Sequence, residues 1–493
     1  MSCFPSKNEF IKSNIPLPIY KNIDIEMDDL SPFDCFREVS SGRYSFLLES
    51  TKGAEGIGRY SFIGTEPYLI FKSKGKRIEI IEEDEKKIIS GSPIDILKDI
   101  LRDKRIYRNN IDLPPFFGGA VGFFSYDLVH FFEKLPQNAK DDLNLPDIYL
   151  IFVDSVVVFD HLKKGVKIIY SFARDLFYKE DREMLYYKGI ERIEYLEKRL
   201  RKCKKNAENG AIIKRDGVVG ATPLSSFTKE EYMDIVERCK EYIKAGDIFQ
   251  ANLSQRFCIN IVKRDPIEIY SLLRRINPSP FSSYIDFDGL NIVSSSPERL
   301  VRLRGRDVET RPIAGTRPRG TDKHEETRFT EELFANEKER AEHIMLIDLE
   351  RNDLGRVCEY GSIRVDEFMV PEYYSHVIHI VSNIRGRLHK GRDCFDLIRA
   401  VFPGGTITGV PKVRCMEIIN ELEPVTRGPY TGSIGYISLS GDMDMNIIIR
   451  SIIIKNKYAY IHVGAGIVAD SDPEREYYET LFKAEAMLKA LTE

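Results

Sequence analysis

The chain has 493 residues, of which 42% are hydrophobic and 30% are charged, a composition typical of a folded globular protein. Its 73 basic and 77 acidic residues leave a net charge of −4, which excludes a globally basic nucleic-acid binder. No apolar run reaches the about 18 residues of a membrane helix, so we expect no nucleic acid and no membrane as a partner. The eight cysteines contain no CxxC pair, which predicts reduced thiols in a cytoplasmic protein.

Residues 1–206 are predicted to form an N-terminal regulatory or structural domain. Segment 76–90 has two short β-runs around an acidic turn, and segments 149–161 and 165–172 are typical of buried strands. Residues 181–206 indicate a charged helix. The stretch 207–227 is polar and glycine-rich without a sustained period, so we predict a linker there.

Residues 228–493 are predicted to form the catalytic domain. Thr228 and Glu231 have the spacing of a capping box, which starts a helix that ends at Gly246. A second helix is predicted over 331–346, and a last one over 473–491 with Asp472 as its cap. Segment 446–468 indicates two buried strands. The pattern as a whole predicts an α+β fold with antiparallel sheets.

Four glutamates form two pairs with helical spacing. Glu339 and Glu342 lie three residues apart on one predicted helix, and Glu476 and Glu479 do so on another, which places each pair on one helix face. Carboxylates from two helices can hold a hard cation such as Mg2+. Two solvated acidic faces are the commoner explanation of such spacing.

Several other motifs allow both a chemical and a structural explanation. The glycines of VGAGIV (463–468) permit a close backbone approach to a carboxylate, or form a β-bulge. GGTITG (404–409) is an anion-cradling turn or a plain loop, and RPIAGTRPRG (311–320) is a polyanion site or a solvated basic loop. Arg450 interrupts an apolar run and requires an acidic partner, either internal or a substrate. A lone histidine such as His379 is more often structural than catalytic.

Taken together, the motifs are far more specific. SFLLES, GRYSFIG, GGAVGF, RPIAGTRPRG, AEHIMLIDLERNDLGRV, GGTITGVPK and GAGIVADSDPEREYYETLFKA follow one another between Ser45 and Lys489. In this order they resemble the large subunits of the chorismate-aminating enzymes, anthranilate synthase component I and aminodeoxychorismate synthase component I. The resemblance implies a two-layer αβ sandwich with large antiparallel sheets flanked by helices. It also implies chorismate as substrate and Mg2+ as cofactor.

The resemblance also assigns site residues position by position. The metal ligands it implies are Glu342, Glu479 and Glu476, and the catalytic positions are His379, Glu339, Gln250 and Thr406. The substrate-binding positions are Gly315, Thr316, Tyr430, Arg450, Gly464, Ala465 and Gly466. His379 is expected to protonate the departing hydroxyl as a general acid.

The nucleophile is expected to be ammonia. The resemblance implies that a separate glutamine amidotransferase small subunit supplies it, and no cysteine here has glycines at −2 and +2 as a nucleophile elbow requires. Gln250 stands where isochorismate-forming relatives carry a lysine base. Glutamine cannot deprotonate water, so amination is expected over hydration.

The motifs disagree on the product. FQANLSQR, NPSPFSS and DLERNDLGRVCEYGS resemble the aminodeoxychorismate branch, so the sequence predicts 4-amino-4-deoxychorismate. Ala314 replaces the lysine that many enzymes of that branch use as a nucleophile, and anthranilate synthase is the close alternative. A non-catalytic partner subunit is a remote one. Glu49 and Ser50, with the altered second half Pro280, Phe281 and Ser282, resemble a tryptophan-inhibition site.

Overall fold

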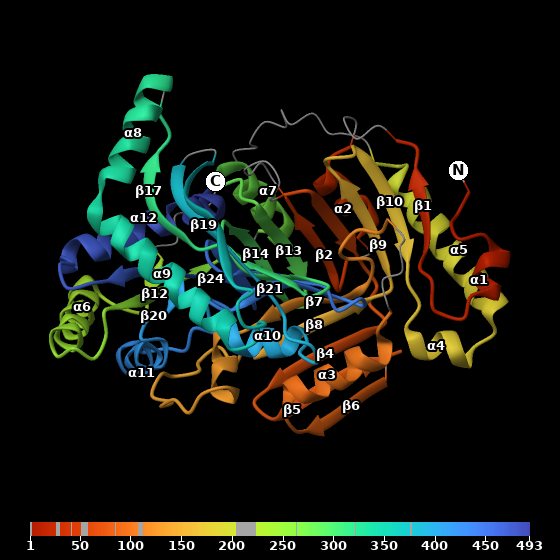
Figure 1. Cartoon of the computed structure of the whole chain (residues 1–493), viewed down its shortest axis with the longest axis horizontal. Coiled ribbons are helices and arrows are strands. Elements are labelled where there is room, and N and C mark those ends of the chain that lie inside the picture. The colour runs from red at the N-terminus through yellow and green to blue at the C-terminus, as the bar shows by residue number, and fades with distance from the viewer. Residues whose placement is uncertain are drawn as a thin grey trace.

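The computed structural model describes residues 2–25, 30–40, 42–50, 58–83, 85–106, 112–203, 223–262, 264–320, 322–374 and 377–493. They form two twelve-stranded sheets with helices around them (Figure 1). Neighbouring strands within each sheet pair antiparallel, as β2 with β13 and β7 with β21. The predicted α+β class, with large antiparallel sheets flanked by helices, is confirmed.

The first sheet contains the strands that carry the glycine motif near residue 464. Its order is β1-β10-β9-β3-β2-β13-β14-β23-β24-β12-β11, and β20 pairs with β12. The bounds are β1 (Ile19–Ile23), β2 (Ser45–Glu49), β3 (Tyr60–Gly64), β9 (Ser155–Asp160), β10 (Gly165–Tyr170), β11 (Leu224–Ser225), β12 (Gln250–Asn260), β13 (Phe281–Asp286), β14 (Leu290–Ser296), β20 (Gly409–Val410), β23 (Ser451–Lys455) and β24 (Tyr458–Ile467).

The second sheet carries the histidine and the arginine-rich motif. Its order is β17-β19-β16-β15-β22-β21-β7-β8-β4-β5-β6, and β18 pairs with β19. The bounds are β4 (Leu69–Lys74), β5 (Arg77–Glu82), β6 (Glu85–Ser90), β7 (Gly119–Phe124), β8 (Ile148–Val153), β15 (Arg299–Arg304), β16 (Asp307–Thr310), β17 (Ile313–Pro318), β18 (Arg364–Tyr373), β19 (Val377–Arg387), β21 (Ser433–Ser438) and β22 (Met443–Ile447).

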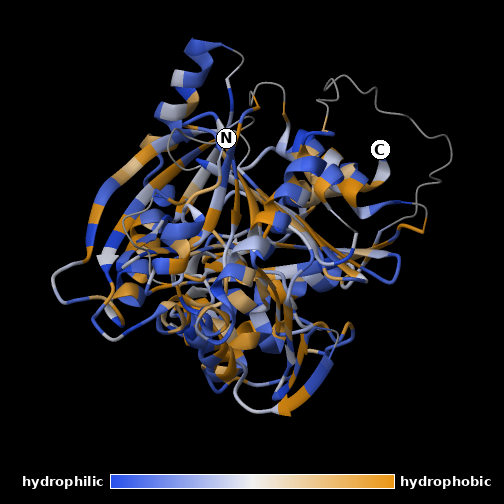
Figure 2. Cartoon of the chain, turned by 90° about the vertical axis from the view of Figure 1, so that its right-hand side faces the viewer, coloured by the Kyte–Doolittle hydropathy of each residue, from blue (hydrophilic) through white to orange (hydrophobic). Residues whose placement is uncertain are grey.

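The helices cover the sheets and connect their strands. They are α1 (Lys7–Lys12), α2 (Pro32–Val39), α3 (Pro93–Lys104), α4 (Arg174–Lys179), α5 (Arg182–Leu200), α6 (Lys229–Lys244), α7 (Pro266–Ile276), α8 (Lys323–Ala335), α9 (Glu337–Gly355), α10 (Cys394–Val401), α11 (Lys412–Leu422) and α12 (Pro473–Thr492), with the 3-10 turns η2 (Tyr126–Phe131) and η3 (Gly405–Ile407). The residues of α8 are largely hydrophilic where this helix projects from the body (Figure 2).

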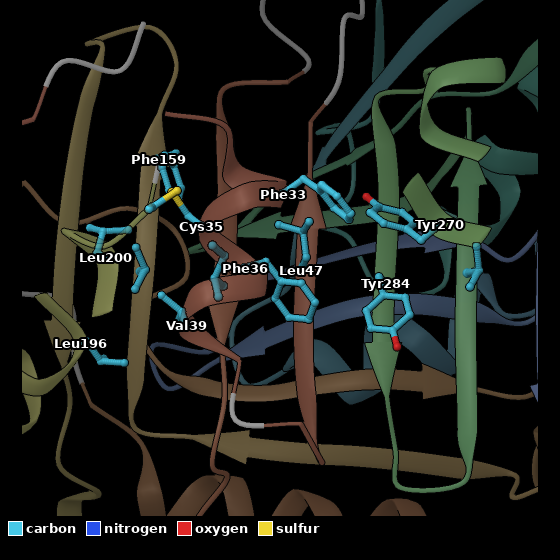
Figure 3. Close-up of a cluster of buried hydrophobic side chains, with 14 of the residues drawn as sticks. Phe33, Cys35, Phe36, Val39, Leu47, Phe159, Leu196, Leu200, Tyr270 and Tyr284 are labelled. Atoms are coloured by element: carbon cyan, nitrogen blue, oxygen red, sulfur yellow. The ribbon is translucent and has the colours of Figure 1, made fainter. Parts of the chain in front are cut away.

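Three apolar clusters hold these layers together. One lies between the sheets, where Phe46 and Phe62 of the first meet Phe123 and Tyr436 of the second. Another packs α2, α5, α7 and α12 onto the outer face of the first sheet. Figure 3 shows Phe36 of α2 and Tyr284 of β13 within it. A third packs α3, α9 and α10 onto the second sheet. Burial of these faces is the main source of stability.

Both sheets combine strands from before residue 207 and after residue 227. β2 lies between β3 and β13, and β7 lies between β8 and β21. The predicted units 1–206 and 228–493 are therefore joined through continuous sheets. Residues 204–222, which hold most of the predicted linker, lie outside the described residues, so the domain boundary stays a prediction.

The capped helices are confirmed, and one prediction is wrong. α6 begins after Thr228 with both capping-box bonds, and α12 begins after Asp472, which accepts from the Arg475 amide. The single helix predicted over 331–346 is instead two helices, α8 and α9, separated at Asn336. Asn336 has an extended backbone, and its side chain accepts from the Glu339 amide, so it starts a new helix.

Candidate active site

The glycines of the VGAGIV motif lie on a regular strand beside β12. β24 pairs with β12 without a register shift from Ala251 to Asn260, so the β-bulge explanation is wrong. A side chain at Gly464 would lie 2.9 Å from the Tyr430 hydroxyl, and one at Gly466 would lie 2.7 Å from Gln250 Nε2. The glycines therefore allow the close approach of two polar side chains to the backbone.

A buried ion pair holds Tyr430 in place. Arg427 and Glu423 are almost fully buried and pair at 2.6 Å. The same guanidinium donates to the carbonyls of Asn252 and Ile407, at 2.5 and 3.0 Å, and thereby joins β12, η3 and the turn before Tyr430. Burial raises the pKa of Tyr430 to about 12, so its hydroxyl stays a hydrogen-bond donor at neutral pH.

Arg450 lies between β22 and β23 and not within a continuous strand. Its φ of 53° is in the left-handed region, a strained conformation typical of functional sites. The guanidinium donates to the Lys483 carbonyl at 2.7 Å, and within the described residues it has no acidic partner within 4.0 Å. Burial lowers its pKa below the ordinary value. A desolvated cation of this kind favours an external acid.

The four glutamates lie on two helices as predicted. On α9, Glu342 accepts from Gln250 Nε2 at 2.9 Å and Glu339 pairs with Arg317 at 2.8 Å. On α12, Glu479 pairs with Lys483 at 2.7 Å. Lys483, which sequence reasoning missed, also donates to the Gly464 carbonyl at 2.9 Å. Each of these carboxylates thus has a cationic or amide partner.

The remaining glutamate, Glu476 on α12, is half-buried. Burial raises its pKa, and a hydrogen bond with Ser471 partly opposes that rise. In the described parts of the chain, no group of three or more His, Cys, Asp or Glu side chains could hold a metal ion. Two buried oxygens, Glu339 Oε2 and Gln250 Oε1, have no hydrogen-bond partner. These all-oxygen donors fit Mg2+ chemically, but they do not form a closed cage.

The histidine faces the PIAGT motif across the sheet edge. His379 Nδ1 lies 2.9 Å from the Gly315 carbonyl and 3.1 Å from Thr316 Oγ1. A carbonyl only accepts, so Nδ1 carries the proton and Nε2 is left as an acceptor. Burial lowers the pKa of His379. The ring is therefore neutral at pH 7, and Nε2 can accept a proton.

Gly315 has to be glycine for two reasons. Its φ is +65°, and a Cβ would lie 2.8 Å from Glu339 Oε2 and 2.8 Å from Leu333 Cδ1. The pairing of β17 with β19 shifts register between Ala314 and Thr316. At this bulge Thr316 Oγ1 lies 3.1 Å from His379 Nδ1, on the neighbouring strand.

Glu298 is a buried acid that sequence reasoning missed. Burial raises its pKa to about 8, although the nearby Thr406 hydroxyl partly offsets that rise. Its carbonyl accepts from the Ile447 amide at 3.0 Å, three residues before Arg450. In the sequence Glu298 follows a run of serines and Pro297, a context that gives no signal of a buried acid. At pH 7 this carboxyl keeps its proton and can donate it.

Comparisons with known proteins identify the family of the chain. The family described as chorismate binding enzyme matches residues 44–489. The chain belongs to this family. It is 43% identical over 97% of its length to anthranilate synthase component 1 of Acetivibrio thermocellus, covering 95% of that protein. It is 42% identical over 96% of its length to aminodeoxychorismate synthase component 1 of Bacillus subtilis (strain 168), covering 97% of that protein.

A solved structure supports the fold of this chorismate-binding enzyme. Anthranilate synthase component I from Streptococcus pneumoniae TIGR4 aligns with a TM-score of 0.74 and 33% identity, covering 87% of this chain and 92% of that one. No helix in the described residues is both long and apolar enough to cross a membrane.

The arginine-rich motif of this chorismate-binding enzyme is neither a polyanion site nor a solvated loop. Arg311 pairs with Glu372 and Glu367, and Arg319 pairs with Glu326 at 2.7 Å. Arg317 pairs with Glu339 as described above. Internal acids therefore pair with all three arginines, of which Arg317 lies on β17 and Arg311 and Arg319 flank that strand.

The residues of the predicted tryptophan site line one cavity of about 810 Å3 between the two sheets: Glu49, Ser50, Pro280, Phe281 and Ser282. Ser50 Oγ donates to the Pro280 carbonyl at 3.0 Å, which joins the two halves of the motif. Glu49 is paired with Arg274 at 2.6 Å. Binding of tryptophan in this cavity stays a prediction.

Proposed function

We propose that the chain converts chorismate and ammonia to anthranilate and pyruvate. The observation that carries this proposal is the 43% identity, over 97% of the chain, to an anthranilate synthase component 1. The sequence alone favoured 4-amino-4-deoxychorismate, which now becomes the second candidate, supported by the 42% identical Bacillus relative. Ala314 offers no amine to attack the ring, which agrees with direct amination by ammonia.

Chorismate carries two carboxylates, and the site offers a cationic region for a dianion. Arg450 lacks an acid of its own within the described residues, and Lys483 lies against the Gly464 carbonyl. Tyr430 keeps its phenolic proton and lies beside Gly464. We assign one substrate carboxylate to the Arg450 guanidinium, the Tyr430 hydroxyl and the Gly464–Gly466 backbone.

Glu342, Glu479 and Glu476 are the residues that would hold Mg2+, which would also bind the other substrate carboxylate. When bound, it withdraws electrons from the ring through that carboxylate. Because Mg2+ usually takes one or two protein carboxylates, with waters and substrate oxygens for the rest, a three-carboxylate cage is not required. To hold the ion, the Glu342 carboxylate would give up the hydrogen bond that it accepts from Gln250 Nε2.

Two groups can move protons at the ring. Glu298 is protonated at pH 7 and is proposed to donate to the departing hydroxyl. This replaces His379 as the acid in our proposal, because the Nδ1 proton of the neutral His379 ring is held by Gly315. His379 Nε2 is then free to take up a proton when pyruvate leaves.

Ammonia is proposed to come from a glutamine amidotransferase subunit. Gln250 donates its amide hydrogen to Glu342 and has no basic nitrogen. Gln250 therefore cannot activate a water molecule, so water activated at this position would not compete with ammonia as the nucleophile.

The test is product identification with purified protein, chorismate, ammonium and Mg2+. We expect anthranilate, recognised by its fluorescence and mass, together with stoichiometric pyruvate. A product of 4-amino-4-deoxychorismate mass without pyruvate would support the second candidate. No turnover by the wild type, with or without an amidotransferase, would support a non-catalytic partner subunit.

The metal assignment is tested separately with Glu342→Gln. Mn2+ binding, followed by electron paramagnetic resonance in the presence of chorismate, should weaken at least about 10-fold, while the melting temperature stays unchanged. Exposed Glu485→Gln on α12 is the control. Equal Mn2+ affinity in Glu342→Gln and wild type would remove Glu342 from the site.

A further inference from the structure

A second cavity lies on the same sheet as His379 but at the far end of β19. Its volume is about 530 Å3, and β15, β16, the start of β18 and the end of β19 form it. Arg385 in its wall is six residues from His379 along β19, about 20 Å at about 3.3 Å per residue. The cavity is therefore separate from the candidate active site.

Arginines dominate the lining of this cavity. Five of them face two acids there: Arg302, Arg304, Arg364, Arg385 and Arg387 against Asp307 and Glu309. Side chains alternate between the two faces of a strand, which explains why the arginines lie together. The neighbouring apolar residues, such as Leu303 and Ile384, point to the helix-covered face of the sheet. The opposite face of the four strands thus presents its charges together.

Internal acids account for only part of this charge. Glu309 pairs with Arg302 at 2.5 Å and with Arg385 at 3.5 Å. Arg385 also pairs with Asp366 at 2.9 Å. Arg387 lies 4.0 Å from Glu359, at the limit of an ion pair. These contacts fix the positions of Arg302 and Arg385.

Two arginines remain without such a partner. Among the described residues, no carboxylate lies within 4.0 Å of the guanidinium of Arg304 or of Arg364. In the pairing of β18 with β19, Arg364 stands directly opposite Arg385. Like charges directly opposite one another on a sheet repel and destabilise it. An anion between them would remove that repulsion.

The lining also limits the kind of anion. Among the described residues that line the cavity there is no aromatic ring, and Val308 is its one sizeable apolar side chain, so the lining favours charged groups over apolar ones. Guanidinium groups bind phosphate and carboxylate oxygens through paired hydrogen bonds. We propose that this cavity, which we call the arginine cavity, binds a compact multivalent anion bearing phosphate or carboxylate groups.

The proposal is tested by isothermal titration calorimetry with inorganic pyrophosphate, without Mg2+ and at constant low ionic strength. We expect wild-type protein to bind one equivalent with a dissociation constant below about 1 mM. Arg364→Gln should bind at least about 10-fold more weakly. Its chorismate turnover and melting temperature should match those of the wild type. Titration with citrate distinguishes a tricarboxylate from a phosphate ligand by which anion binds more tightly.

Arg328→Gln on α8 is the matched control, because Arg328 is likewise exposed and has only distant partners at 3.5 and 3.7 Å. It should bind pyrophosphate like the wild type. The proposal is wrong if the wild type binds neither anion, or if Arg364→Gln and Arg328→Gln weaken binding equally, which would indicate general charge attraction.

Discussion

Two arginines near the candidate active site, the buried Arg427 and the half-buried Arg450, differ in their partners. Arg427 pairs with Glu423 at 2.6 Å and also donates to two main-chain carbonyls. Arg450 has one carbonyl acceptor, a left-handed backbone and no acid within reach in the described residues. A compensated buried cation joins structural elements, whereas an uncompensated one is prepared for a ligand that brings the missing charge.

Arg427→Ala should give the largest loss of stability. The substitution leaves Glu423 as a buried charge without its cationic partner and takes one donor from each of two carbonyls, which costs about 3–5 kcal/mol. Urea unfolding measures this loss in the free energy of unfolding. Arg414→Ala, which breaks the half-exposed pair with Asp247, is the control and should cost at most about 1 kcal/mol. Equal losses in both variants would contradict the structural role of Arg427.

Arg450→Gln should show the opposite pattern. Since no internal acid loses its partner, the free energy of unfolding should not fall. Loss of a charged hydrogen bond to the substrate should lower kcat/KM for chorismate about 10- to 100-fold. Steady-state kinetics measure this, and Arg450→Lys should restore part of the activity. A destabilisation as large as that of Arg427→Ala would show that Arg450 is structural.

Gly315→Ala tests whether the backbone at Gly315 is constrained by its left-handed conformation and by its neighbours. The left-handed φ and the contacts with Glu339 and Leu333 should together cost about 1–3 kcal/mol. Gly305 also has a left-handed φ, of +60°, but open space around it, so Gly305→Ala isolates the cost of the backbone. Thermal unfolding of both variants should show Gly315→Ala as the less stable.

Glu298 extends the comparison to an acid that has no cationic partner within the described residues. Its folded pKa is about 8, above the ordinary 4.5, so the folded protein keeps a proton that the unfolded chain loses. Stability should therefore fall as pH rises from about 4.5 to about 8, by at most about 1.4 kcal/mol per pH unit. Glu298→Gln should flatten this slope in urea unfolding at pH 5, 6.5 and 8. An unchanged slope would contradict burial of a protonated Glu298.

The sequence predicted best what depends on short spacing. The caps at Thr228 and Asp472 are local side-chain to backbone bonds, and both helices began where expected. The break at Asn336 was missed because helix-favouring residues lie on both sides of it. Segment 149–161 was treated as one strand-like run, yet β8 and β9 belong to different sheets on either side of Asp154.

The candidate site was predicted through motifs and not through geometry. The spacing of Glu339 and Glu342 indicated one helix face, but not that Arg317 and Gln250 would contact them. Arg427 could not be recognised, because the carbonyls it binds come from residues 252 and 407. Glu298 looked ordinary for the same reason, since its burial depends on strands distant in sequence.

The interleaving of the two sheets bears on how the chain is made. Gly118 beside β7 meets Ser438 on β21, 320 residues later in the sequence. One edge of β2 and one edge of β7 therefore stay unpaired during synthesis until β13 and β21 have been made. Exposed strand edges are templates for aggregation. Such long-range closure makes folding slow. Recombinant production should therefore gain from chaperone co-expression and low temperature, and halves expressed separately should be insoluble.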